Sequence, residues 1–416
     1  STILRSRTGK RQMTNTFRLV GIAIALCGLS ACAGVKDSVS NLIAKETDNS
    51  IPPAELVDFD PTIKVERLWS DRYGKGVENL FIQLIPAPYE DRIFTADRNG
   101  RVIALDSQTG DEIWSERDKH LRISGGPGAG DGNVYVGTSD AEVVAFDAET
   151  GERKWLTTVS SEVLAAPRSA GGTVVVRTGD GKLFGLFAET GKRKWVYDRT
   201  IPVLTLRGTG APVIYAGSVI AGFDNGRLVA LDLATGKQQW ETQLAVSSGR
   251  SDLERMVDVD AEPTILDDTA YVATFQASVA AVSLISGQLE WSREISSYSN
   301  VAADDERVYV TDALGYVWGL ERSSGTSIWK QQALKARQVS GPAVIGDYVV
   351  IGDLEGYLHW LDRETGDFVY RTRLDDTRIL VPAKTIDDIL VAFSSSGVLA
   401  AYRPGRKAAA DQSDDL

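Results

Sequence analysis

The sequence predicts an all-β protein: an eight-bladed β-propeller of four-stranded antiparallel blades, closed by pairing an N-terminal strand with the C-terminal blade. Three observations predict this fold class. A strand, a turn ending in Thr-Gly or Ser-Gly and an aromatic residue recur seven times, at nearly constant spacing, and the two ends of the array each hold part of one further blade. The turn glycines are Gly110, Gly151, Gly191, Gly236, Gly287, Gly325 and Gly366.

The spacing of these glycines matches one blade per repeat. The steps between them are 41, 40, 45, 51, 38 and 41 residues, and a four-stranded blade takes roughly 40–45. Within a repeat, a stretch of small residues with proline, such as Ala166-Pro167, suits the innermost strand, where blades crowd around the axis. A β-branched run such as 134–136 predicts the second strand, and the motif itself supplies the third.

The recurring turn has a local chemical explanation. Asp or Ser after the third strand, such as Asp106, can bond its own downstream backbone, and the glycine accepts the left-handed geometry that closes a hairpin. The aromatic residue, tryptophan in six of the seven motifs and Tyr370 in the last, then begins the fourth strand. Such a tryptophan buries about 150–250 Å², so we expect it to cover the seam between neighbouring blades.

The two ends of the array decide the number of blades. Residues 65–69, ending in Trp69, have the pattern of a fourth strand without the first three, and residues 397–402 have that of a third strand without a fourth. We infer that they complete one blade, which gives eight blades over residues 63–403 and removes the free sheet edge of an open array. We expect residues 404–416 to be a disordered tail.

The segment before the repeats predicts export and lipidation. Residues 1–31 read as a signal peptide, because the apolar run 19–31 is too short to span a bilayer. Met13 is a candidate start, in which case residues 1–12 are an upstream artefact. Residues 29–32 (Leu-Ser-Ala-Cys) resemble the lipobox of bacterial lipoproteins, which implies cleavage before Cys32 and lipid on that residue. An ordinary secretory cleavage site is the alternative.

The lipobox resemblance also implies a location. Ala33 follows the cysteine where inner-membrane lipoproteins usually carry Asp, so the expected destination is the outer membrane, facing the periplasm. Residues 32–62 would be the lipidated tether. Loss of residues 1–31 removes five positive charges and no negative ones, which changes the formal net charge from −12 to −17. So acidic a surface is a poor partner for nucleic acid.

Side chains for catalysis and metal binding are scarce. The two histidines, His120 and His359, have no metal-ligand spacing with Cys, Asp or Glu, and we expect both to be structural or exposed. Cys27 lies in the segment to be discarded and Cys32 is the lipid site, so no thiol remains for a nucleophile. The glycine-rich residues 125–130 lead into a strand and are interpreted as an innermost strand, not a phosphate loop.

The repeat resembles the tryptophan-docking motif of pyrroloquinoline quinone (PQQ) dehydrogenases, a family of eight-bladed propellers. This resemblance implies the alternative function, a PQQ-dependent periplasmic dehydrogenase with quinone and calcium on the axis. The vicinal disulfide on which many of those enzymes stack the quinone cannot form here, the chain is shorter, and the acidic residues near the inner strands form no recognisable ligand set. We therefore expect no enzyme activity, no catalytic residue, no cofactor and no metal site.

Two consecutive connections are longer than the period requires. They are residues 198–210 and 242–260, each between a tryptophan and the next innermost strand, so they should emerge side by side on one face of the disc. The first displays Leu204, Leu206 and Arg207, and the second contains Asp258 and Asp260. An arginine and carboxylates around apolar residues suit docking of a protein partner. Alternatively, the leucines tuck beneath the loop and the charges are solvated.

At these residues the resemblance becomes specific. The lipobox, the eight repeats, Leu-Thr-Leu-Arg at 204–207 and Asp-Val-Asp at 258–260 resemble the BamB family of lipoproteins of the β-barrel assembly machinery (BAM complex), over the whole expected mature chain. The resemblance implies a non-catalytic scaffold that assists folding and insertion of outer-membrane proteins and binds the POTRA domains of BamA through Leu204, Leu206, Arg207, Asp258 and Asp260. Other BAM complex members and nascent outer-membrane proteins are further expected partners.

Overall fold

The computed structural model describes residues 51–77, 82, 84–198, 210–223, 226–245, 258–259 and 261–405. All strands belong to one compact unit, Pro53–Leu416. Several predictions concern residues outside the described ranges: the signal peptide 1–31, Cys32, the tail beyond residue 405, and four of the five expected partner-binding residues (Leu204, Leu206, Arg207 and Asp260). Within the described ranges, the chain forms no apolar helix long enough to cross a membrane.

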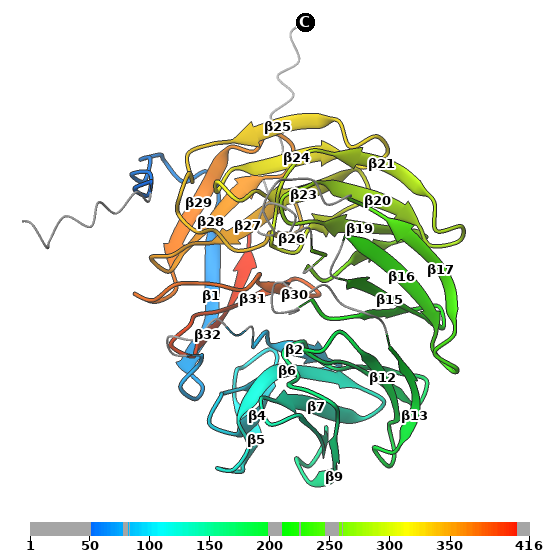
Figure 1. Ribbon diagram of the computed structural model, residues 1–416. Coiled ribbons are helices and arrows are strands. Elements are labelled where there is room, and N and C mark those ends of the chain that lie inside the picture. The colour runs from blue at the N-terminus through cyan, green and yellow to red at the C-terminus, as the bar shows by residue number, and fades with distance from the viewer. Residues whose placement is uncertain are drawn as a thin grey trace, which may run out of the picture. The chain divides into compact units, whose positions relative to one another are not determined.

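The predicted fold class is confirmed: the described residues form 32 strands and no helix, arranged as eight four-stranded antiparallel sheets in a propeller (Figure 1). Blade 1 consists of β2 (Ala87–Tyr89), β3 (Arg92–Ala96), β4 (Arg101–Asp106) and β5 (Glu112–Arg117), and blade 2 of β6 (Ile123–Gly130), β7 (Asn133–Thr138), β8 (Glu142–Asp147) and β9 (Arg153–Thr158). Blade 3 consists of β10 (Arg168–Ala170), β11 (Thr173–Arg177), β12 (Leu183–Phe187) and β13 (Arg193–Tyr197), and blade 4 of β14 (Val213–Tyr215), β15 (Ser218–Phe223), β16 (Arg227–Asp232) and β17 (Gln238–Gln243).

The second half of the ring repeats the same order. Blade 5 consists of β18 (Thr264–Leu266), β19 (Thr269–Ala273), β20 (Val279–Ser283) and β21 (Leu289–Arg293), and blade 6 of β22 (Ala302–Ala303), β23 (Arg307–Thr311), β24 (Val317–Glu321) and β25 (Ser327–Gln331). Blade 7 consists of β26 (Ala343–Ile345), β27 (Tyr348–Gly352), β28 (Tyr357–Asp362) and β29 (Phe368–Arg373), and blade 8 of β30 (Lys384–Ile386), β31 (Ile389–Phe393), β32 (Val398–Pro404) and β1 (Val65–Arg72). The glycine-rich residues 125–130 lie in the innermost strand β6, as predicted.

The predicted closure by the chain ends is also confirmed. β1 pairs with β32 from Val65 opposite Pro404 to Arg72 opposite Val398, and the two strands lie beside each other in Figure 1. The backbone N–H of Gly405 donates to the carbonyl of Lys64 at 2.7 Å, so the pairing continues one residue past each strand. The closed ring leaves no blade with a missing strand.

The core lies between blades because the middle strands are covered on both faces. Every residue of β11 is buried, as is every residue of β31, whereas the outer strand β5 is partly exposed throughout. In the recurring turns, the carboxylate of Asp106 accepts hydrogen bonds from the backbone N–H groups of Gln108 (2.9 Å) and Thr109 (2.8 Å), and Gly110 has a φ of 76°. The turn thus has the predicted local chemistry.

A tryptophan docks one blade onto the next at seven of the eight seams. The indole N–H of Trp195 in blade 3 donates to the carbonyl of Leu233 in the turn of blade 4 at 2.9 Å, and its ring covers Gly236 of that turn. The same bond joins Trp69 to Ser107, Trp114 to Ala148, Trp155 to Ala188, Trp240 to Leu284, Trp291 to Arg322 and Trp329 to Arg363. The tryptophans therefore cover the seams, as predicted.

Part of the predicted tether packs against the propeller. Residues 53–62, here called the strap, run along the outer strand β29 of blade 7. The backbone N–H of Thr62 donates to Val369 at 3.0 Å, and the guanidinium of Arg371 donates to the carbonyl of Val57 at 2.9 Å. Phe59 stacks on Phe368 with ring centroids 5.5 Å apart. The chain therefore joins the ring at a fixed place, blade 7.

Candidate partner-binding face

Strand alternation sorts the connections onto two faces. Each fourth strand leads to the next innermost strand on the face that also carries the turns between second and third strands, while the Thr-Gly turns lie on the opposite face. The two oversized connections, 198–210 and 242–260, are both of the first kind. They precede and follow blade 4, so the parts of them that the structure describes flank the same blade.

The first oversized connection is held at both ends. It leaves β13 at Asp198, whose carboxylate lies 3.7 Å from the ammonium of Lys182. It returns at Gly210, whose carbonyl accepts a hydrogen bond of 3.1 Å from the guanidinium of Arg177. Arg177 is the last residue of β11 and is only 2% exposed. A buried guanidinium thus fixes the point at which this connection rejoins the ring.

The second oversized connection is anchored by backbone bonds and one apolar side chain. It leaves β17 through Leu244, whose N–H donates to Gly226 at 2.8 Å. It returns at Val259, whose N–H donates to the carbonyl of Phe223 at 3.3 Å. Val259 is fully buried over Gly222, where an added Cβ would lie 2.2 Å from a Val259 methyl carbon. The missing side chain of glycine makes room for this anchor.

Among the expected partner-binding residues, the structure describes Asp258 alone. Its side chain is 2% exposed, and its carbonyl accepts a hydrogen bond of 3.1 Å from the N–H of Phe275 in blade 5. Asp258 thus lies in the seam between blades 4 and 5 beside the buried Val259, and its expected contact with a partner stays a prediction. Sequence reasoning also missed Arg177 and Phe223, which depart from the residue types at the matching positions of other blades.

The centre of the propeller contains a partly buried ion pair. Arg168 begins β10 of blade 3, and its guanidinium bonds the carboxylate of Glu262, which precedes β18 of blade 5. Blade 4 lies between them, so the pair reaches across the inner strands. Burial opposes ionisation of Glu262, but Arg168 and Lys384 together hold the pKa of Glu262 below its usual value. This carboxylate is already neutralised by cations of the protein, which fits poorly with ligation of the calcium required by a quinone site.

The described residues contain no group of three or more His, Cys, Asp or Glu side chains arranged to hold a metal. Of the two histidines, His120 is exposed and His359 is fully buried. The Nδ1 atom of His359 accepts a hydrogen bond from Arg371 at 3.1 Å, so its Nε2 carries the proton and donates to Asp353 at 3.0 Å. Burial lowers the pKa of His359 and favours this neutral form. His359 therefore has a structural role, as expected.

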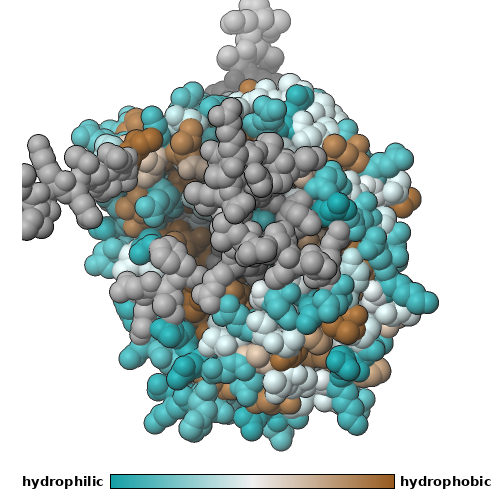
Figure 2. Space-filling model, in the orientation of Figure 1, coloured by the Kyte–Doolittle hydropathy of each residue, from teal (hydrophilic) through white to brown (hydrophobic). Residues whose placement is uncertain are grey.

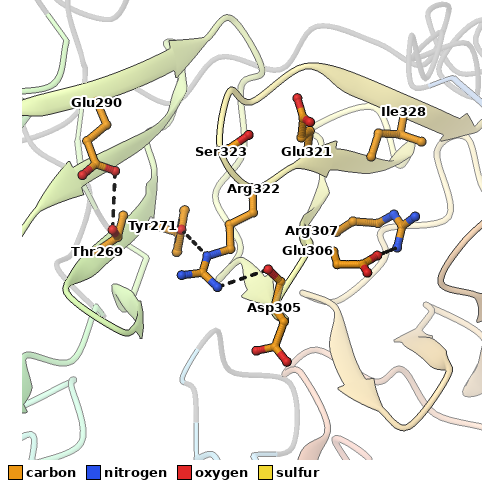
Figure 3. A pocket seen from close by; sticks show the side chains of 10 residues that line it. All are labelled: Thr269, Tyr271, Glu290, Asp305, Glu306, Arg307, Glu321, Arg322, Ser323 and Ile328. Carbon is orange, nitrogen blue, oxygen red and sulfur yellow. Dashed lines mark hydrogen bonds and ion pairs between the residues drawn. The ribbon is translucent and has the colours of Figure 1, made fainter.

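A pocket of about 670 Å³ lies between blades 5 and 6, on the face of the Thr-Gly turns (Figure 3). Its guanidinium groups are bound by the protein itself. Arg322 donates to the hydroxyl of Tyr271 at 2.9 Å and to the carbonyl of Asp305 at 3.2 Å, and Arg307 donates to Glu306 at 3.0 Å. The bond to Tyr271 helps raise the pKa of Arg322. These contacts favour a structural role for the lining charges.

Exposed apolar side chains are dispersed over the described surface. Ile113 (43% exposed), Val196 (43%) and Ile328 (48%) lie on the outer strands of three different blades. On the face shown in Figure 2, hydrophobic areas are correspondingly scattered among hydrophilic ones. Single exposed apolar residues are normal for a soluble surface, so these positions do not define a docking site.

Comparison with known proteins identifies similar chains. A family model described as outer membrane protein assembly factor BamB matches residues 98–331. The chain is 37% identical over 397 residues to outer membrane protein assembly factor BamB of Xanthomonas campestris pv. campestris, covering 93% of this chain and 97% of the relative. It is 42% identical over 384 residues to the BamB of Pseudomonas aeruginosa, covering 92% and 97%.

Solved structures give the same picture of the fold. The crystal structure of BamB from Moraxella catarrhalis matches with a TM-score of 0.75 and 26% identity, over 82% of this chain and 100% of that one. A quinohemoprotein alcohol dehydrogenase from Comamonas testosteroni matches with a TM-score of 0.65 and 14% identity, over 84% of this chain and 78% of that one. At such low identity the second match shows a shared fold alone.

Proposed function

Since the chain belongs to the BamB family of outer membrane protein assembly factors, we propose that it is a non-catalytic scaffold that binds the periplasmic POTRA domains of BamA. The chain is an outer membrane protein assembly factor and a member of the BAM complex, associated with the outer membrane. Its scaffold role is supported by one observation above all: two adjacent oversized connections are rooted by buried residues on either side of blade 4.

The proposed contacts divide between the two connections. Leu204, Leu206 and Arg207 of the first would supply an apolar centre and a guanidinium, and Asp260 of the second a carboxylate. Buried apolar and arginine anchors carry most of the affinity in such interfaces, while charges set orientation and association rate. Because Asp258 is 2% exposed and bonded through its carbonyl to blade 5, we assign it the task of holding the second connection in place.

Attachment to the membrane is proposed to run through Cys32, lipidated after cleavage of residues 1–31, with the propeller on the periplasmic side. The strap supports this arrangement because it fixes the point where the tether joins the ring. Mass spectrometry of the protein from membranes should find acyl chains on Cys32. Recovery of an unmodified, freely soluble chain would contradict the anchor.

The proposal is tested by measuring the affinity of the chain for a soluble fragment containing the POTRA domains of BamA. Replacing Leu204, Leu206 and Arg207 together by alanine should weaken binding about 30-fold or more, as expected for loss of a hot spot worth about 2 kcal/mol. Matched control substitutions are Ile285→Ala with Leu289→Ala, at residues 78% and 45% exposed beside the Ser286-Gly287 turn on the opposite face. Normal binding by the triple variant would refute the assigned surface.

The alternative function, a PQQ-dependent dehydrogenase, predicts a different experimental result. Quinone with calcium should then raise the melting temperature of the chain and support oxidation of alcohols or sugars. The Arg168–Glu262 pair between the innermost strands argues against this outcome, because a bound cation would have to compete with the guanidinium. A calcium-dependent rise in melting temperature together with oxidation would replace the scaffold proposal.

A further inference from the structure

One residue position, at the end of each second strand, has the same role in seven of the eight blades. It lies four or five residues before the third strand begins, and its short polar side chain bonds the following turn. The carboxylate of Asp312, for example, accepts hydrogen bonds from the N–H groups of Leu314 and Tyr316, both at 2.9 Å. The corresponding residues are Asp97, Thr138, Thr178, Thr274, Asp353 and Ser394.

Blade 4 breaks this rule. Its residue at the position is Phe223, which pairs with Arg227 four residues later and cannot cap the turn. The ring is 2% exposed and packs at 5.9 Å from the ring of Tyr197 in blade 3. An apolar ring has therefore replaced a capping group in the blade that lies between the two oversized connections.

The preceding blade carries a second departure next to the first. Arg177 occupies the position before the cap in blade 3, where six other blades have Ala, Gly or Thr (Ala96, Gly137, Gly222, Ala273, Thr311 and Gly352). Its guanidinium lies over the ring of Phe223, 5.8 Å from the ring centroid. Arg177 and Phe223 thus meet across the seam between blades 3 and 4.

These two residues connect the ends of the oversized connections. Arg177 donates to the carbonyl of Gly210, where the first connection rejoins the ring, at 3.1 Å. The carbonyl of Phe223 accepts from Val259, where the second one rejoins, at 3.3 Å. The bond from Val259 to Phe223 recurs in other blades, because the N–H groups of Val163 and Ile379 donate to the carbonyls of Thr138 and Asp353, which are the capping residues of blades 2 and 7. The link from Gly210 through Arg177 to Phe223 is specific to this seam among the described residues.

We infer that Arg177 and Phe223 form a positioning pair that fixes the two oversized connections relative to each other, so that both meet the same partner domain. This inference rests on the proposed function, and it assigns a role in recognition to residues that lie beneath the contact surface. A cation over a ring and a buried hydrogen bond are each modest interactions. Their effect is geometric: a misplaced half of a two-part interface loses the affinity that simultaneous contact provides.

The test compares four variants of the full chain for folding and for affinity toward the BamA POTRA fragment. Phe223→Thr restores the capping residue of blades 2, 3 and 5, so it should keep the eight-bladed fold while binding falls at least about tenfold. Phe223→Tyr keeps the ring beneath the guanidinium and should bind nearly as the unmodified chain does. Arg177→Met should weaken binding as Phe223→Thr does, and the double variant should be no worse than either.

Phe393→Ala provides the matched control. Phe393 ends the second strand of blade 8, is 4% exposed, and belongs to the blade across the ring from blade 4, away from connections 198–210 and 242–260. Its removal should lower the melting temperature at least as much as Phe223→Thr does and leave the affinity unchanged. Wild-type affinity of a folded Phe223→Thr variant would overturn the inference, and so would an equal loss of affinity in Phe393→Ala.

Amide exchange separates this inference from the proposed function. Arg177→Met changes a residue that makes no hydrogen bond to Val259, yet it should speed exchange of the Val259 N–H by acting through Phe223. If the unmodified chain fails to bind the POTRA fragment, the proposed function is wrong. Amide exchange at Val259 then decides by itself whether Arg177 and Phe223 position the two connections. Unchanged exchange at Val259 in Arg177→Met would show that the two connections are independent.

Discussion

Trp360 of β28 pairs with Tyr370 of β29, so blade 7 has a tryptophan on its third strand and a tyrosine on its outer strand. Elsewhere the outer strand carries the tryptophan and the third strand a small residue, as with Trp195 opposite Gly185. The reason lies in blade 8, whose third and fourth strands come from the two chain ends and so lack a Thr-Gly turn on which an indole could dock. Tyr348 closes this seam instead by donating to the carbonyl of Gly405 at 3.2 Å.

Replacing tryptophan by phenylalanine should therefore cost more at Trp195 than at Trp360. The indole N–H of Trp195 donates to Leu233 at 2.9 Å, and phenylalanine would leave that carbonyl unpaired. The indole N–H of Trp360 has no hydrogen-bond partner in the described part of the chain. We expect Trp195→Phe to lose about 1–3 kcal/mol more of the free energy of unfolding than Trp360→Phe, measured by urea unfolding. Equal losses would mean that the docking hydrogen bond contributes nothing.

Adding a methyl group to a docking turn should disturb the seam. Gly236 has a φ of 70°, and a Cβ there would lie 2.6 Å from the indole of Trp195. Gly217 has a φ of 77° with nothing within 4 Å of its Cβ position, so Gly217→Ala measures the backbone cost alone, about 1–2 kcal/mol. Gly236→Ala should cost about 1–3 kcal/mol more, because the indole must move. Similar melting temperatures for the two variants would contradict close ring-on-glycine packing.

The buried ion pair beneath the strap should be sensitive to removal of one partner. Arg337 and Asp353 are 3% and 0% exposed, with their charged atoms 2.8 Å apart, and Arg337 also donates to the carbonyl of Ala54 in the strap. Arg337→Met should lower the free energy of unfolding by about 3–5 kcal/mol, since it leaves a buried carboxylate without its guanidinium.

A second substitution checks that explanation. Asp353→Asn keeps an oxygen to accept from the turn N–H groups of Glu355 and Tyr357, each at 2.9 Å, while it removes the charge. The double variant with Arg337→Met should therefore lose less stability than the sum of the two single losses. Strict additivity would show that the charges of Arg337 and Asp353 are not coupled.

Stability should fall in mild acid because of His359. Burial lowers the pKa of His359 in the folded protein below its unfolded value of 6.5, despite Asp353 facing the ring, with Arg371 and Arg337 opposing the added charge. As pH falls below about 6.5, the unfolded chain binds a proton that the folded protein excludes, so the free energy of unfolding decreases until the lowered pKa is passed. His359→Gln should flatten the melting temperature between about pH 7 and pH 5, and exposed His120→Gln should not. A similar slope in all three proteins would exclude His359 as its source.

Much of the architecture could be predicted from the sequence because the residues that form each turn and each seam lie within one repeat and its neighbour. Asp106, Gly110 and the following tryptophan specify a turn and a docking ring through contacts within one repeat and its neighbour. The candidate site was less predictable. Asp258 belongs to a polar sequence that suggests exposure, but the burial of Val259 against Gly222 places it in the interior.

The sequence by itself determined the number of blades, the join between Val65–Arg72 and Val398–Pro404, and the excess length of connections 198–210 and 242–260, since all of these follow from short-range patterns counted along the chain. The tertiary structure alone decided that Arg177 and Phe223 meet across a seam and that the strap is held by Arg371 on blade 7. Such contacts join residues that are far apart in the sequence and that meet only when the ring closes. A pattern of neighbouring residues therefore does not predict them.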